Sequence, residues 1–192
     1  MLPDYSPVFL KYNEELKPLI SEIEGRVERF SQPLLMNLAS VFDYLSISAA
    51  EGQDSQKNLD EANKMLDLCI SQSYMSLIYA IRNNTDAFEK SVGKAGMKKL
   101  DNGHFIGPYT NLRKQRNSLM SQAECQDERE AKPLFEQAYK VVTRMEAMVN
   151  KEKPNLSIVQ SEKLSMIGTL LRWVLSIAIS VLVGLLVNHF GG

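Results

Sequence analysis

Histidine is nearly absent from this chain, with two residues among 192. His104 lies in a stretch that is rich in glycine, and His189 lies close to the C-terminus. A Ser-His-Asp triad or a histidine-based metal site would depend on His104 alone, which is too little for either kind of site. The sequence therefore predicts a protein that is not an enzyme and that holds no metal.

Motifs for phosphate binding and for helical metal or nuclease sites are also missing. Residues 92–96 place two glycines around a lysine, but they lack the spacing of a phosphate-binding loop and follow no strand. No Glu-x-x-His pair is present to build a di-metal bundle. The arginine-histidine motif of HEPN-type helical nucleases is missing too, because the residues at the required spacing before His104 are Met97, Lys98 and Lys99. We therefore expect no cofactor.

Cysteine is scarce and charge of one sign does not dominate. Cys69 lies in an apolar run and Cys125 precedes a polar turn, and we expect both to be free thiols. The 22 basic and 23 acidic side chains nearly cancel, so the overall charge gives no argument for nucleic acid or for an acidic partner. Any electrostatic role must be local.

A long hydrophobic run occurs once, at residues 170–190. As a helix this run is about 31 Å long, close to the hydrocarbon thickness of a bilayer at about 30 Å. Trp173 and Phe190 stand at its ends as aromatic residues of the membrane interface, and Arg172 is placed to reach the headgroups. We predict a C-terminal transmembrane anchor; the alternative is a buried helix of a soluble core.

The charges around this run predict its orientation. Lys151, Lys153, Lys163 and Arg172 precede the span and no lysine or arginine follows it, which favours a cytoplasmic N-terminal domain. Residues 1–9 have neither the basic region nor the apolar region of a signal peptide. The predicted organisation is a cytoplasmic bundle over 1–153, a juxtamembrane linker or helix over 154–169 and a single-pass anchor over 170–190, which would lie in the inner or plasma membrane if the protein is bacterial.

One face of the predicted span carries small residues at every fourth position. Such a row lets two membrane helices approach closely, and its hydroxyls are able to hydrogen-bond between helices. The alternative is that small residues are simply common in membrane helices. The predicted packing residues are Gly168, Arg172, Ser176, Ser180 and Gly184. They indicate a homo-oligomer in the lipid bilayer.

The remaining sequence predicts an all-α bundle of about five helices, because apolar residues recur at spacings of three and four and no strand-like alternation is sustained. Residues 8–30 form one amphipathic segment, which we expect Pro18 to bend or restart. A second helix is predicted to start at Pro33. The most apolar segment outside the span, residues 55–83, is predicted to be the central helix and to end at residues 83–86.

The second half of the domain is predicted to contain a loop and two more helices. Residues 93–108 hold four glycines and a proline, which favours an ordered loop or hinge. A weaker helix follows from Tyr109, and Asp127 with Glu130 resembles a capping box for the helix with the clearest apolar stripe.

One region is locally basic. Residues 90–116 contain seven basic residues and one acidic residue, whereas residues 1–62 contain eleven acidic and five basic residues. Three interpretations remain open: contact with anionic lipid, pairing with the acidic N-terminal helices, and a solvated surface. Nucleic acid is disfavoured, since no known binding motif is present. The basic residues are Lys90, Lys94, Lys98, Lys99, Arg113, Lys114 and Arg116.

A helical bundle followed by a tail anchor is similar in outline to the Bcl-2 family of cell-death regulators. The Asn-Trp-Gly-Arg signature of that family is absent, and the single tryptophan lies in the predicted anchor. The similarity therefore implies an order of parts and no site residues.

Three functional hypotheses follow. The first is a non-enzymatic, tail-anchored protein whose cytoplasmic domain self-associates and binds an unidentified protein partner at the membrane surface. The second is an oligomeric, pore-type effector of a cell-suicide or antiviral defence system. The third is a degenerate HEPN-like nuclease that uses Arg113 and Arg116.

Overall fold

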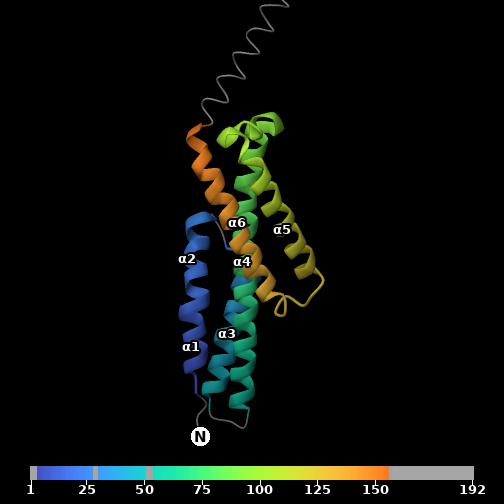
Figure 1. Cartoon of the computed structure of the whole chain (residues 1–192). Coiled ribbons are helices and arrows are strands. Elements are labelled where there is room, and N and C mark those ends of the chain that lie inside the picture. The colour runs from blue at the N-terminus through green and yellow to red at the C-terminus, as the bar shows by residue number, and fades with distance from the viewer. Residues whose placement is uncertain (1–3, 28–29, 51–53, 156–192) are drawn as a thin grey trace, which may run out of the picture.

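The computed structural model describes residues 4–27, 30–50 and 54–155, and these residues form an all-α structure of five helical rods (Figure 1). The predicted all-α bundle of about five helices is confirmed for this part of the chain. None of its helices is both long and apolar enough to cross a bilayer. The predicted linker and anchor lie outside the described residues, as do Gly168, Arg172, Trp173, Ser176, Ser180, Gly184 and Phe190.

The first rod runs continuously through α1 (Ser6–Lys11), a π-helical segment η1 (Tyr12–Leu16) and α2 (Lys17–Arg26). Pro18 lacks a backbone N–H, and its ring would crowd a carbonyl of the preceding turn in a regular α-helix. The turn before it is widened instead, with the Lys17 N–H bonded to the carbonyl of Tyr12, five residues back. The predicted restart at Pro18 is therefore a local widening within one rod.

The second rod, α3 (Gln32–Ala49), begins where the sequence predicts. The Ser31 hydroxyl accepts a 3.4 Å bond from the Leu34 N–H, and Pro33 occupies the first turn, where no backbone donor is needed. Leu34 and Val41 face the core.

The third rod, α4 (Ser55–Met97), is longer than predicted. The helix does not end at residues 83–86, because Asn83 and Asn84 face solvent while Thr85 is buried and bonds its hydroxyl to the Arg82 carbonyl at 3.0 Å. The buried side chain of Phe88 continues the apolar stripe beyond this point. Regular helical geometry is interrupted at Gly93, whose φ of 71° suits glycine.

The predicted loop of residues 93–108 is mostly a compact turn. A short 3₁₀ segment η2 (Leu100–Gly103) with positive φ at three consecutive residues reverses the chain, and α5 (Ile106–Glu124) already begins before Pro108. Leu100 and Phe105 are buried beneath the turn, which holds it against the bundle.

The last rod is α6 (Lys132–Glu152), which ends in the 3₁₀ turn η3 (Lys153–Asn155). The predicted start at Asp127 is wrong by about one turn. The Asp127 carboxylate instead accepts a 3.0 Å bond from the Arg129 N–H and closes a separate turn, and Pro133 occupies the first turn of the helix.

Two hydrophobic cores follow one another along α4. The first rod and α3 pack on the N-terminal half of α4, whereas α6 packs on its C-terminal half and α5 packs mainly on α6. The cores meet at Tyr74 of α4 and Tyr139 of α6, whose ring centroids are 5.4 Å apart. Along its 43 residues, α4 is about 60 Å long, so each core covers roughly half of it.

An ionic cluster links the two halves beside this junction. Asp67 of α4 accepts bonds from Lys11 at 2.9 Å and from Lys132 at 3.0 Å, and Lys132 also contacts Glu15 at 2.6 Å. Burial of Asp67 opposes ionisation, but the hydrogen bonds from the two lysines outweigh it and hold the carboxyl pKa below its usual value. The cluster joins the first rod, α4 and α6 through one carboxylate.

Asp67→Asn is expected to lower the free energy of unfolding by about 1–2 kcal/mol at pH 7. Because the pKa of Asp67 is lower in the folded than in the unfolded chain, its contribution is complete above about pH 4 and is lost as the pH falls through the folded-state pKa. Urea unfolding between pH 7 and pH 2.5 measures this. Equal losses of stability on acidification in the parent and in Asp67→Asn would contradict it.

Candidate functional site

The first candidate site is an apolar surface on the outer side of α1 and α3. It consists of side chains that are all more than half exposed: Phe9, Leu10, Leu35, Met36, Phe42 and Ile47. Four of them, Leu35, Met36, Phe42 and Ile47, lie on α3 outside its buried stripe, and Asp43 is the one charged residue of this helix. A surface helix that is apolar on both sides is typical of one that is covered by another element.

A groove runs through this surface between α1 and α3. It has a volume of about 270 Å³, with Phe9 and Tyr12 on one wall, Phe42 and Leu45 on the other, and Leu66 of α4 lining it as well. Its lining is mostly apolar, which suits a hydrophobic side chain of a partner.

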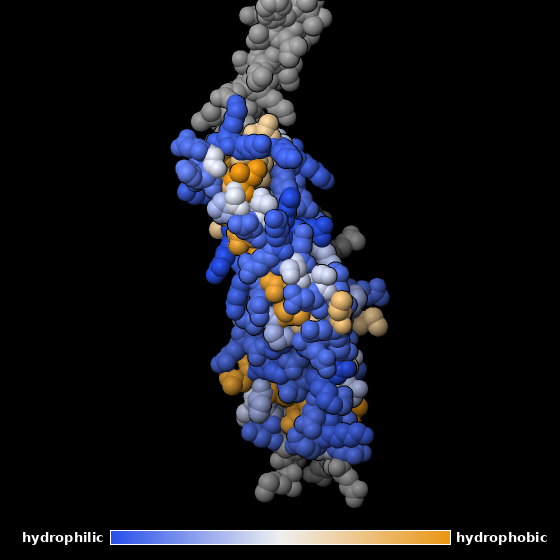
Figure 2. Space-filling view, turned by 45° about the vertical axis from the view of Figure 1, so that its right-hand side comes forward, coloured by the Kyte–Doolittle hydropathy of each residue, from blue (hydrophilic) through white to orange (hydrophobic). Residues whose placement is uncertain are grey.

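The second candidate site is the basic end of the domain, formed by Lys90, Lys94, Lys98 and Lys99, all of which are exposed. They lie near the C-terminus of α4, at the same end of the bundle as η3, where the described chain stops (Figure 1). On the face that Figure 2 shows, the surface is mostly hydrophilic along the whole domain, with separate hydrophobic patches. The apolar surface lies around the other half of α4.

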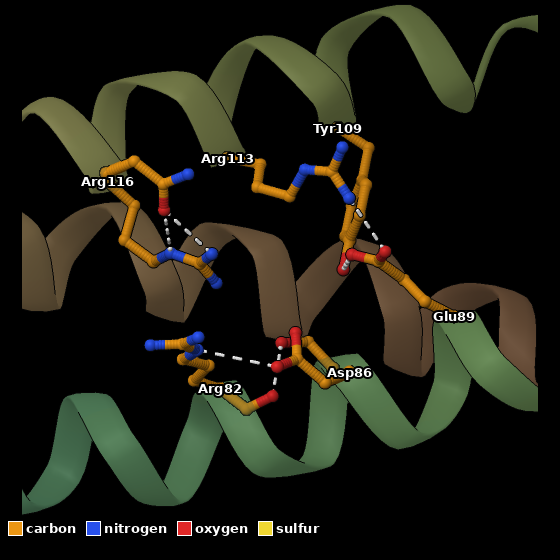
Figure 3. Close-up of polar contacts among 8 residues, drawn as sticks. Arg82, Asp86, Glu89, Tyr109, Arg113 and Arg116 are labelled. Carbon is orange, nitrogen blue, oxygen red and sulfur yellow. Dashed lines mark hydrogen bonds and ion pairs between the residues drawn. The ribbon is translucent and has the colours of Figure 1, made fainter.

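The remaining predicted basic residues lie along α5 and have different surroundings. Lys114 and Arg113 are both exposed, and Arg113 donates a 2.8 Å bond to Glu89 of α4. Glu89 also accepts a 2.9 Å bond from the buried Tyr109 hydroxyl (Figure 3). Burial and this hydrogen bond raise the pKa of Tyr109. Glu89 thus neutralises Arg113 and ties α5 to α4.

Arg116 differs from the other six basic residues because its side chain is buried, with 5% of the residue exposed. Its Nε and Nη2 donate to the Asn117 side-chain oxygen at 3.1 and 2.9 Å, and its Nη1 is buried without a hydrogen-bond partner. Burial and the nearby positive charge of Arg82 lower the pKa of Arg116. An unpaired buried donor costs about 1–3 kcal/mol, so this arrangement requires an explanation.

A pocket of about 170 Å³ lies beside Arg116, between α4 and α5. Figure 3 shows Arg116 reaching from α5 toward α4 and Arg82 reaching from α4 toward α5. Arg82 contacts Asp86 at 3.4 Å, a long distance for an ion pair. Two guanidinium groups therefore line the pocket, and neither has a carboxylate partner at a short ion-pair distance.

The sequence contains a signal for the burial of Arg116. Tyr109, Leu112, Arg116, Leu119 and Ala123 follow one another at spacings of three and four, which is the buried stripe of α5. An arginine within an apolar stripe is predicted to face the interior. The prediction grouped Arg116 with the exposed lysines because they are close in the sequence, and it therefore missed that Arg116 is buried.

The described residues contain no group of three or more His, Cys, Asp and Glu side chains able to hold a metal ion. Both cysteines are free thiols, as predicted. Cys69 is buried, and burial raises its pKa to about 12, so its thiol stays protonated and unreactive at neutral pH.

Arg116→Met is expected to change the free energy of unfolding by less than about 1 kcal/mol, or to raise it, because methionine fills the site without a buried unpaired charge. Tyr109→Phe is the matched change on the same buried stripe and should lower stability by about 1 kcal/mol, since it removes the bond to Glu89. Urea unfolding of the two variants compares these values. A loss above about 2 kcal/mol in Arg116→Met would mean that Arg116 has a stabilising partner.

Comparison of the chain with models of protein families, with curated protein sequences and with solved structures finds no match. Its function is therefore inferred from three local arrangements: the apolar surface on α1 and α3, the basic end, and the pocket beside Arg116.

Proposed function

We propose that this protein is a non-enzymatic, tail-anchored membrane protein whose helical domain mediates self-association and partner binding at the membrane surface. The observation that carries the proposal is the apolar surface of α1 and α3, where large hydrophobic side chains remain more than half exposed. Large hydrophobic side chains that gather on a surface often mark a binding site, and Phe9 and Phe42 share one groove here.

The size of this surface suits a second copy of the same chain. Large hydrophobic side chains expose about 200 Å² when free, so six that are about half exposed offer roughly 600 Å². A standard interface buries about 800 Å² on each partner, and the polar rim around the stripe supplies the difference. A surface that carries one acid and no lysine or arginine on α3 has little to attract a charged partner. A second copy of the chain is able to cover this apolar surface without supplying complementary charges.

The basic end supports a location at the membrane. The four lysines lie at the end of the bundle from which the chain continues toward the predicted span. Near an anionic leaflet each lysine contributes about 1 kcal/mol, and several together orient a tethered domain. The anchor supplies the attachment, and the lysines set which end of the domain faces the lipid.

Met36→Glu combined with Phe42→Glu is expected to weaken dimerisation by about 100-fold, because two carboxylates would be buried in an apolar interface. The experiment uses the full-length protein in detergent with Gly184→Leu, so that packing of the predicted membrane helices does not mask the effect. Light scattering coupled to size exclusion measures the mass. Tyr79→Glu, at a residue of α4 outside the apolar surface that is 45% exposed, is the matched control. An unchanged dimer in the double variant would contradict the proposal.

Lys94 and Lys98 are expected to react with an amine-acylating reagent about fivefold more slowly in nanodiscs of anionic lipid than in nanodiscs of zwitterionic lipid. Lys57, exposed near the opposite end of α4, should react equally in both. The difference should disappear at 1 M salt, where charges are screened within about 3 Å. Equal rates for all three lysines would show that the basic end does not face the bilayer.

A further inference from the structure

The pocket between α4 and α5 is the one place among the described residues where a buried guanidinium leaves a nitrogen without a hydrogen-bond partner. Arg116 is 5% exposed, its Nη1 forms no hydrogen bond, and a second guanidinium, that of Arg82, lies close enough to lower its pKa. Two like charges beside a pocket repel each other unless an anion lies between them. Self-association through α1 and α3 does not explain this arrangement, because the pocket lies on other helices.

The polar lining of the pocket consists mainly of hydrogen-bond donors. Arg116 occupies the Asn117 side-chain oxygen, which leaves the amide NH₂ of Asn117 to donate. Ser121, one turn further along α5, adds a hydroxyl. Two guanidinium groups, an amide NH₂ and a hydroxyl make a donor set that fits an oxyanion with several acceptor oxygens.

None of the nearby carboxylates forms a hydrogen bond with the free Nη1 of Arg116. Asp86 is engaged by Arg82 at 3.4 Å, and Glu89 is engaged by Tyr109 and Arg113. Glu124 also lines the pocket, without an ion pair to Arg116. Its carboxylate repels any anion, so a ligand has to gain more from the two guanidinium groups than it loses to Glu124.

The apolar part of the lining consists of Ile78, Tyr79 and Met120. Tyr79 is 45% exposed, so its ring is available to a ligand. With a volume of about 170 Å³, the pocket has room for a phosphate group together with part of an organic substituent.

From these contacts we infer that the pocket lined by Arg82, Arg116, Asn117 and Ser121 binds the phosphate group of a small phosphate ester or of a lipid headgroup. The guanidinium of Arg116 supplies the buried charge, and Arg82 closes on the anion from the side of α4. Apolar parts of the ligand lie against Tyr79 and Met120.

The test follows the Nε–H resonances of the arginine side chains in ¹H–¹⁵N spectra of the full-length protein in zwitterionic detergent. Inorganic phosphate and glycerol phosphate are titrated at constant ionic strength, with chloride as the reference anion. Arg82 and Arg116 should shift in a saturable manner, while Arg129, an exposed arginine outside the pocket, should show only the chloride response. Arg116→Met should weaken phosphate binding at least tenfold, and Arg113→Gln should leave it within twofold.

A second arm identifies the source of the phosphate. The same resonances are recorded in nanodiscs with and without phosphatidic acid, in the absence of soluble phosphate. Shifts that require phosphatidic acid assign the site to a headgroup, and shifts that require soluble phosphate assign it to a free phosphate ester. Responses of Arg82 and Arg116 no larger than that of Arg129 in both arms would overturn the inference, as would phosphate binding that survives Arg116→Met unchanged.

Discussion

The structure depends on α4, since neither hydrophobic core is complete without it. The N-terminal half of the helix gives Leu59, Leu66 and Ile70 to one core, and the C-terminal half gives Phe88 and Val92 to the other. Because both cores share one helix that is regular up to Gly93, the two halves of the domain are held at a fixed separation. The ionic cluster at Asp67 and the tyrosine pair at the junction stabilise this arrangement from the side. Surfaces that differ in character can therefore occupy opposite ends of a single domain.

The sequence predicts the helices well where periodicity and local capping agree, and less well where side chains compensate for poor helix formers. Ser31 and Pro33 specify the start of α3, and the structure confirms it. Residues 83–86 have low helix propensity, but their polar side chains face solvent or bond to the helix itself, and burial of Phe88 outweighs the propensity cost. The start of α6 was missed because Asp127 caps a turn of its own. Local sequence signals alone do not determine where these helices start and end, because burial of side chains in the folded domain decides between the possible boundaries.

For the candidate sites too, the sequence predicts some features, whereas others depend on how the helices pack. Scanning the sequence for charge finds the lysines near the end of α4, and the structure shows them exposed. The same scan places Arg116 with them, although its spacing within the stripe of α5 already points inward. The apolar surface was harder to foresee, because Phe42 and Met36 look like ordinary core residues until the packing of α3 shows which face is covered. Which side of an apolar helix is buried depends on its neighbours, and a single sequence does not supply that information.

A tail-anchored protein that pairs through α3 is constrained in how its two copies are related. Both anchors have to enter the same bilayer, so the two-fold axis of the pair must run along the membrane normal, close to the long axis of the bundle. In the proposed pair the two α3 helices are parallel, and residues at equal height, such as Phe42 of each copy, face each other. Leu66 of α4 lines the same groove as Phe42, so this contact lies about 40 Å along α4 from Lys94. In the proposed arrangement the basic ends of both copies would point to the lipid, so pairing and membrane contact would reinforce each other. A partner that approached with reversed polarity would lose one of the two.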